Sequence, residues 1–167
     1  MNSVEPVFVG EDNPYGDDSR FALYPHPDGT AGARLCRLVC GLPRADYIGL
    51  RRTNLCVGKW SAPAARKAAD QLRLDVLPGH VLVLLGRKVA GAFGLADSLA
   101  FSTAREADRA VYGPLDVQRL GAAGQVVRYV LLPHPSGRNT TWNEPGAFER
   151  ARSLLRAAVP GVAWGTA

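Results

Sequence analysis

The sequence has few cysteines, no long apolar run and no repeated or low-complexity segment, and these absences exclude several classes of protein. Its three cysteines are Cys36, Cys40 and Cys56. A four-cysteine iron–sulfur cluster needs more thiolates than this, and the spacings favour buried thiols. We therefore expect no metal centre. The longest strongly apolar run, residues 81–85, is far shorter than the roughly 20 residues that cross a bilayer, so we expect no membrane partner.

The amino-terminal residues also lack the basic region followed by an apolar region that marks a signal peptide. We therefore expect a cytoplasmic protein. The chain has 167 residues and no linker-like composition, so residues 1–167 are expected to form one monomeric domain. A domain of this length buries roughly 70% of its surface on folding and needs no disulfide.

Charge favours a polyanionic partner. The chain carries 20 Lys and Arg residues against 15 Asp and Glu, a formal net charge of +5. Such an excess attracts nucleic acid, although many basic proteins never bind it. Charge alone therefore does not identify the partner.

Apolar extended runs alternate with segments of helical period along the chain. The expected strands cover residues 7–9, 47–54, 81–85 and 126–132, and the expected helices cover residues 31–42, 62–74 and 88–93. Strands that alternate with helices form right-handed crossovers around a mainly parallel sheet. The sequence therefore predicts an α/β fold, a three-layer α/β/α sandwich.

A final helix is expected near the carboxyl terminus. Asn143 can cap it, Glu144 suits its positive end, and Pro145 is tolerated in its first turn. An inward apolar stripe follows at helical spacing, consisting of Phe148, Ala151, Leu154, Leu155 and Ala158. Residues 94–124 are expected to form an irregular excursion with one helix over residues 103–111.

His134 is the strongest candidate for catalysis. It lies between Pro133 and Pro135, directly after the apolar run 126–132. Two prolines restrict the backbone around His134, and a strand end in an open α/β sheet is a usual place for a ligand. The same pattern is also typical of an ordinary turn that ends a strand.

A second polar segment follows the first expected strand. Residues 10–15 contain Glu11, Asp12 and Asn13. Parallel strands end at the same edge of a sheet, so this segment and His134 are expected to face one cleft. The alternative role for Asp12 is an Asx-turn or a cap.

Together these segments resemble the uracil-DNA glycosylase superfamily. Residues 10–15 resemble its first motif, of the Gly-Gln-Asp-Pro-Tyr type, and residues 134–136 resemble its distal His-Pro-Ser loop. Residues 53–55 look like the segment that carries its base-recognising asparagine, and residues 81–86 look like its central strand and turn. The resemblance covers most of the chain but leaves the branch unassigned.

This resemblance implies a monofunctional DNA glycosylase that flips uracil or a related damaged base out of DNA and hydrolyses its N-glycosidic bond without a cofactor. The departing base gains negative charge and the sugar gains positive charge. His134 would donate an N–H to the base, and Asp12 would oppose the sugar and orient water. Because the first motif has one residue more than the family form, Asn13 or Glu11 can instead occupy the position of Asp12.

Base selection would depend on an amide and on aromatic rings. Asn54 carries both a donor and an acceptor and can read one edge of uracil. Tyr15 resembles the tyrosine that excludes the methyl group of thymine, and Phe21 or Tyr24 can stack on the base. Ordinary aromatic packing is the alternative role for all three rings.

The distal loop would hold the DNA. Ser136 and the backbone N–H groups around Gly137 can bind phosphate, whereas Arg138 and Asn139 can enter the gap that a flipped nucleotide leaves. Arg138 can equally be a solvated surface charge. Trp142 is expected to be a packing anchor, because it directly precedes the final helix.

Three other functions fit the same pattern. One is a glycosylase that removes a modified cytosine from foreign DNA as a defence. Another is a catalytically silent DNA-binding module of the same fold. The third is a hydrolase of a small molecule, which would bind no DNA.

Overall fold

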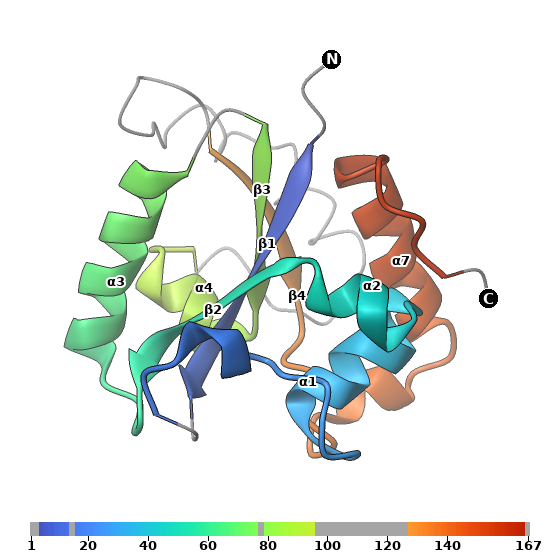
Figure 1. Ribbon diagram of the computed structural model, residues 1–167, viewed down its shortest axis with the longest axis horizontal. Coiled ribbons are helices and arrows are strands. Elements are labelled where there is room, and N and C mark those ends of the chain that lie inside the picture. Colours follow the sequence, from blue (N-terminus) through green and yellow to red (C-terminus); the bar gives the residue numbers. More distant parts are fainter. Residues whose placement is uncertain (1–3, 14–15, 77–78, 96–126, 166–167) are drawn as a thin grey trace.

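Parallel strands form the central sheet of the protein (Figure 1). The computed structural model describes residues 4–13, 16–76, 79–95 and 127–165. In these residues a four-stranded sheet has the order β2-β1-β3-β4, and each neighbouring pair is parallel. The strands are β1 (Glu5–Asn13), β2 (Arg51–Val57), β3 (His80–Leu85) and β4 (Arg128–Leu132).

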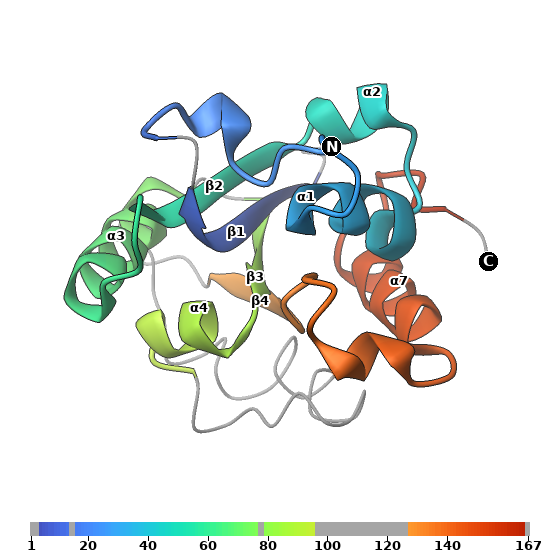
Figure 2. The same cartoon turned by 90° about the horizontal axis from the view of Figure 1, so that it is seen from below.

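Helices cover both faces of this sheet, which confirms the predicted three-layer α/β/α sandwich (Figure 2). One face is covered by α3 (Ala62–Asp75) and α4 (Arg87–Ala92). The other face is covered by α1 (Ala31–Arg34), the π-helix η2 (Leu35–Cys40), α2 (Arg44–Ile48) and α7 (Ala147–Ala158). Two apolar cores result, one on each side of the sheet.

The central strands are apolar on both faces because both faces are covered. Val7 and Val9 pack on the α3 side, whereas Phe8 packs on the α7 side. All residues from Val81 to Leu85 are fully buried. Such continuous apolar runs are typical of parallel sheets.

The predicted strand 47–54 is wrong at its start. Tyr47 belongs to α2, and β2 begins at Arg51 and continues to Val57. The buried ring of Tyr47 packs on Phe8, with ring centroids 6.4 Å apart, and its hydroxyl donates to the carbonyl of Leu23 at 2.9 Å. Short apolar runs of this kind do not distinguish a strand from a buried helix.

The predicted helix 31–42 is also divided differently. The α-helix α1 ends at Arg34 and continues as η2, until Gly41 with φ of 64° ends it. Residues 10–13 of the polar segment, which was expected in a loop after the first strand, instead belong to β1, which extends to Asn13.

The final helix begins later than predicted. Asn143 ends the 3₁₀ helix η4 (Thr140–Asn143), and Gly146 precedes the first residue of α7, so Asn143 caps nothing here and Pro145 lies outside the helix. The predicted stripe faces the core, where Ala151, Leu154, Leu155 and Ala158 are buried. Trp142 is the predicted anchor, because it is buried and stacks on Phe148 with ring centroids 5.2 Å apart.

The predicted helix 103–111 and Tyr15 lie outside the described residues. In the described part of the chain, no helix is long and apolar enough to span a membrane. The three cysteines are buried and form no disulfide. Burial raises the pKa of the Cys36 and Cys40 thiols, so both stay protonated at neutral pH.

Candidate active site

A pocket of about 190 Å³ lies where the carboxyl ends of the strands meet the segment before α1. Four separate segments of the chain contribute to it. The pocket is lined by six residues that the sequence singles out, namely Glu11, Asp12, Phe21, Tyr24, Asn54 and His134. The structure thus brings together the two polar segments, the amide and two of the three aromatic rings.

The sequence did not indicate the residues that roof this pocket. Leu23, Thr30, Ala31 and Gly32 complete its lining. Gly32 allows the closest approach, because a Cβ atom there would lie 2.2 Å from the carbonyl oxygen of Tyr24. Leu23 has a φ of 49°, a left-handed conformation that is unusual for leucine. The roof is therefore formed by backbone in close contact with α1.

Two long side chains attach the roof to the sheet layer. Tyr47 binds the carbonyl of Leu23, and Arg52 Nε donates to the carbonyl of Ala22 at 3.2 Å. Arg52 Nη1 also donates to the carbonyl of Tyr47 at 2.8 Å, and its guanidinium lies over the Tyr47 ring. Arg52 is thus a structural residue of the roof rather than a solvated charge.

His134 is held at one end of the pocket by its own loop. Its Nδ1 accepts the backbone N–H of Ser136 at 3.2 Å. Its carbonyl oxygen accepts from Trp142 Nε1 at 2.9 Å and from Asn139 Nδ2 at 3.2 Å. Because Nδ1 is an acceptor, the neutral ring carries its proton on Nε2. The imidazole therefore offers a fixed Nε2–H donor.

The surroundings keep this imidazole neutral. Burial lowers the pKa of His134 below its ordinary value, and Lys88 lowers it further, whereas the carboxylates of Glu11 and Asp12 act in the opposite direction. At neutral pH a hydrogen-bond donor without positive charge results. A neutral imidazole of this kind can polarise a carbonyl group.

The three candidates for the acidic position differ in their surroundings. Glu11 Oε2 is paired with Lys88 Nζ at 3.2 Å. Asn13 is buried, does not line the pocket, and donates from Nδ2 to the carbonyl of Asp18 at 3.1 Å. Asp12 is exposed at the pocket rim, and no residue of the described part binds its carboxylate. Asp12 is thus the carboxylate best placed to meet a ligand.

Lys88 and Gly86 are two site residues that the sequence did not indicate. Both follow β3 at the edge where the pocket lies. Lys88 Nζ lies 5.6 Å from the centre of the Trp60 ring and holds Glu11. Gly86 has a φ of 96°, and a Cβ atom there would lie 3.0 Å from His134 Cβ. Their position after a strand, at the same edge as His134, was the available signal.

Asn54 faces Gly10 on the neighbouring strand. The two residues are register partners, and a Cβ atom on Gly10 would lie 2.2 Å from Asn54 Oδ1. This oxygen is buried and has no hydrogen-bond partner within the described residues. A buried acceptor without a donor is costly, so the site is completed when a donor binds there.

The aromatic rings of Phe21 and Tyr24 line one side of the pocket. They contact each other edge to face, with centroids 5.6 Å apart. Phe21 is the last residue of the short 3₁₀ helix η1 (Ser19–Phe21) and is 41% exposed. An exposed ring beside a pocket can stack on a planar ligand.

In the distal loop, some side chains form hydrogen bonds within the loop and others do not. Asn139 uses both ends of its amide within the loop, because Oδ1 accepts from the N–H of Thr141 and Nδ2 donates to His134. Gly137 and Arg138 are exposed, and Ser136 is half-buried. Asn139 therefore positions the histidine, whereas Ser136 and Arg138 are free to meet a ligand.

Within the described residues no three His, Cys, Asp or Glu side chains cluster closely enough to hold a metal ion. No protein-family model matches the sequence, and a search of curated proteins finds no match either. Function is therefore inferred from the geometry of the pocket.

Proposed function

We propose that this protein is a monofunctional DNA glycosylase that hydrolyses the N-glycosidic bond of uracil or a related damaged base. The observation that carries the proposal is the pairing of a neutral, fixed imidazole donor with a free carboxylate on one small pocket. Cleavage of this bond creates opposite charges on the base and the sugar. His134 and Asp12 suit these opposite charges.

Pocket size favours a single ring as the ligand. Sites for drug-sized molecules measure about 300–1,000 Å³. This pocket has about 190 Å³. A flipped base would enter it, whereas the sugar and phosphates would stay at the rim near Asp12.

In the proposed reaction the bond between C1′ and the base nitrogen breaks, and its electron pair stays with the base. The Nε2–H of His134 donates to a base carbonyl oxygen as that oxygen gains charge. Asp12 stabilises the cationic sugar and orients the water whose oxygen bonds to C1′, and the Asp12 carboxylate accepts the proton that this water loses. The departing base anion takes up a proton from solvent. A preorganised donor such as His134 is worth about 3 kcal/mol or more.

Base recognition is assigned to Asn54. Its unpaired Oδ1 can accept the ring N–H of uracil, and its amide N–H₂ can donate to a neighbouring carbonyl. Cytosine has no N–H at the equivalent ring position. Sites that depend on such hydrogen bonds discriminate by about 10⁴ or more.

Base release from oligonucleotides tests the proposal. We expect the protein to produce abasic sites in a single- or double-stranded uracil oligonucleotide, detected as strand cleavage after alkaline treatment. His134→Gln and Asp12→Asn should each lower the rate by about 10²-fold or more. The matched control is His80→Gln, since His80 begins β3 at the opposite edge of the sheet and should leave the rate unchanged.

The same assay separates the alternatives when a panel of modified bases is included. Release of a modified cytosine without release of uracil would favour a defence glycosylase. DNA binding without release of any base would contradict the enzymatic proposal and favour a binding module.

A further inference from the structure

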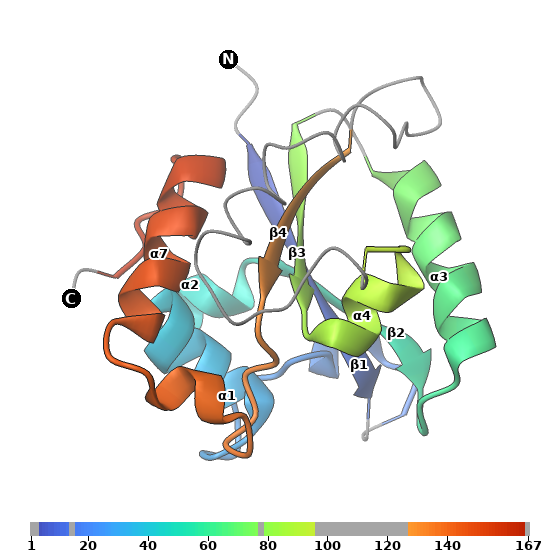
Figure 3. The same ribbon diagram turned by 180° about the vertical axis from the view of Figure 1, so that it is seen from behind.

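A second hollow is lined by residues that adjoin, along the chain, the α1 residues of the candidate pocket, hereafter the base pocket. It measures about 190 Å³ and is lined by Gly29, Ala33, Arg34, Arg37 and Leu38. The segment after β4 passes directly beside α1 (Figure 3). Two arginines thus line a hollow whose neighbours are the residues of the distal loop.

Arg34 connects this hollow to the distal loop. Its Nε donates to the carbonyl of Pro135 at 2.9 Å, and its Nη1 lies 4.0 Å from where a Cβ atom on Gly137 would be. Within the described residues no acceptor binds the two terminal nitrogens of Arg34. The guanidinium is therefore fixed by one N–H and directs its remaining donors along the distal loop.

Arg37 adds a second positive charge to the same hollow. Its Nη1 lies 3.2 Å from Asp28 Oδ1, and the side chains of Arg37 and Asp28 are 64% and 71% exposed. Asp28 competes with an incoming anion, but exposed ion pairs of this type contribute little. Arg37 can therefore exchange Asp28 for a phosphate at small cost.

We propose that this hollow binds a backbone phosphate of the DNA strand whose base enters the pocket. The inference rests on the proposed function and extends it to a phosphate site on α1. Ala31 and Gly32 line the base pocket, and Arg34 follows on the same helix, within about one turn or 5.4 Å along its axis. A phosphate next to the flipped nucleotide would thus meet Arg34 and Arg37.

The chemistry of arginine fits this ligand. A guanidinium presents parallel N–H donors that match two phosphate oxygens, and it stays charged at every working pH. Asp28 neutralises only one of the two arginines, so the hollow retains a positive charge for an anion. The proposed ligand is a phosphodiester in a strand rather than free phosphate, because the half-buried Ser136 and the exposed Arg138 lie in the same loop as Pro135, which Arg34 contacts.

The salt dependence of DNA binding tests this site. The probe is a fluorescent single-stranded oligonucleotide with one tetrahydrofuran abasic-site analogue, which has no bond to cleave. The slope of log K against log salt is negative, and each lost phosphate contact decreases its magnitude by about 0.7 for single strands. We expect this decrease for Arg34→Gln and for Arg37→Gln. Arg37 is exposed, so its variant should fold normally.

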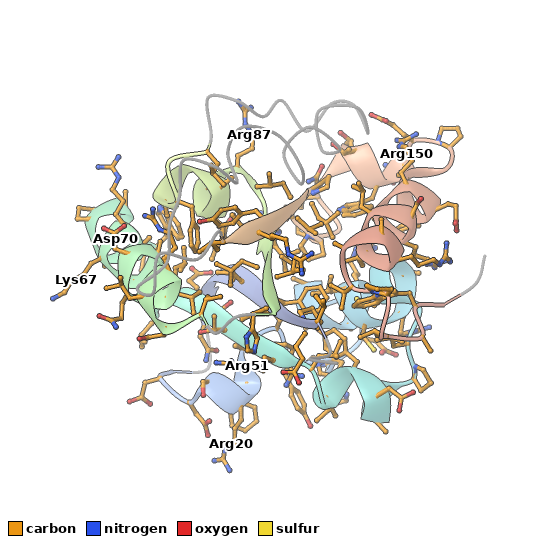
Figure 4. The ribbon with its side chains drawn as sticks, turned by 90° about the horizontal axis from the view of Figure 1, so that it is seen from above. Arg20, Arg51, Lys67, Asp70, Arg87 and Arg150 are labelled. Atoms are coloured by element: carbon orange, nitrogen blue, oxygen red, sulfur yellow. The ribbon has the colours of Figure 1, made fainter. Side chains whose placement is uncertain are left out.

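Lys67→Gln is the matched control. It removes one positive charge from α3, where Lys67 projects away from the sheet (Figure 4). Its slope should equal that of the unmodified protein. Equal slopes for all four proteins, or an equal decrease in all three variants, would overturn the proposed site.

Two further measurements locate the phosphate. Replacing single phosphates by neutral methylphosphonates should weaken binding at one position near the abasic analogue, and Arg37→Gln should abolish that effect. Inorganic phosphate at constant ionic strength should compete poorly. Full competition would overturn the assignment to a DNA strand.

These binding measurements are independent of base release. If the protein releases no base but the slopes change as expected, the glycosylase proposal fails and the phosphate site stands. If base is released and the slopes do not change, only the phosphate site fails.

Discussion

Single glycines determine how closely the functional side chains approach one another. Gly10 leaves space for the amide of Asn54, and Gly86 leaves space for His134. At Gly10 the obstructing atom is the end of a side chain beside an open pocket. At Gly32 the nearest atoms are backbone carbonyl atoms of the roof. An added methyl group should therefore change recognition at Gly10 and the fold itself at Gly32.

Gly10→Ala should reduce base selectivity without unfolding the protein. Its Cβ would lie 2.2 Å from Asn54 Oδ1, so the amide must turn into the pocket and lose its alignment with the base. We expect the ratio of uracil release to cytosine release to fall by about tenfold or more, because hydrogen-bonding sites supply the largest discrimination. This ratio is measured from the rates of base release on two oligonucleotides that differ only in carrying uracil or cytosine at one position.

Gly161→Ala is the control for this substitution. No atom lies within 4 Å of a Cβ at Gly161, and its φ is not positive. Its selectivity should equal that of the unmodified protein. An unchanged ratio in Gly10→Ala would show that Asn54 does not read the base.

At the scale of elements, the distal loop is positioned by η4 and α7. Trp142 in η4 stacks on Phe148 in α7 and donates its indole N–H to the carbonyl of His134. Trp142 thus links the final helix to the backbone of His134.

Trp142→Phe should lower both the free energy of unfolding and the rate of base release. Phenylalanine keeps the stacking on Phe148 but loses the hydrogen bond to His134. Loss of a buried hydrogen bond costs about 1 kcal/mol. The loop around His134 becomes less fixed, and the rate of base release should fall severalfold. Denaturant unfolding and the alkaline cleavage assay measure the two effects.

Trp164→Phe provides a matched comparison. Trp164 is also buried and donates its indole N–H to the carbonyl of Val159 at 2.9 Å, away from the pocket. Both variants should lose similar stability, but only Trp142→Phe should lose activity. Equal rates in the two variants would contradict a positioning role for Trp142.

Elements also show what the sequence could predict. In a parallel sheet all carboxyl ends lie at one edge, so the sequence order of strands was sufficient to place Asp12, Asn54 and His134 near one another. The roof was not predictable in this way. Arg52 bonds to Ala22, and Gly32 contacts Tyr24, through backbone carbonyl groups that leave no trace in apolar periodicity.

At the scale of the whole molecule, the protonation of His134 is linked to the free energy of unfolding. The buried end of the pocket holds His134 between the carboxylates of Glu11 and Asp12 and the ammonium of Lys88. Hydrogen bonds from Ser136, Asn139 and Trp142 hold His134 in this position in the folded chain. Its protonation is therefore linked to folding.

This linkage gives a pH dependence with a definite sign. The pKa of His134 in the folded protein is below its ordinary value, chiefly because of burial. The unfolded chain takes up a proton near pH 6.5, before the folded protein does. Above that pH the protonation of His134 does not change stability, and below it the free energy of unfolding decreases until the pH reaches the folded-state pKa. His134→Gln should remove this part of the decrease when urea unfolding is followed from pH 7 downward.

A Lys88→Gln variant provides a second test of the same pH dependence. Its charge lowers the pKa of His134, so Lys88→Gln should bring that pKa closer to its ordinary value and make the decrease in stability shallower. Lys67→Gln removes the same charge from α3 and should leave the decrease unchanged. A decrease that is equally steep in His134→Gln and in the unmodified protein would show that the imidazole is not buried as described. The neutral donor that the proposed mechanism of base release requires would then be lost as well, since only a desolvated His134 stays uncharged at mildly acidic pH.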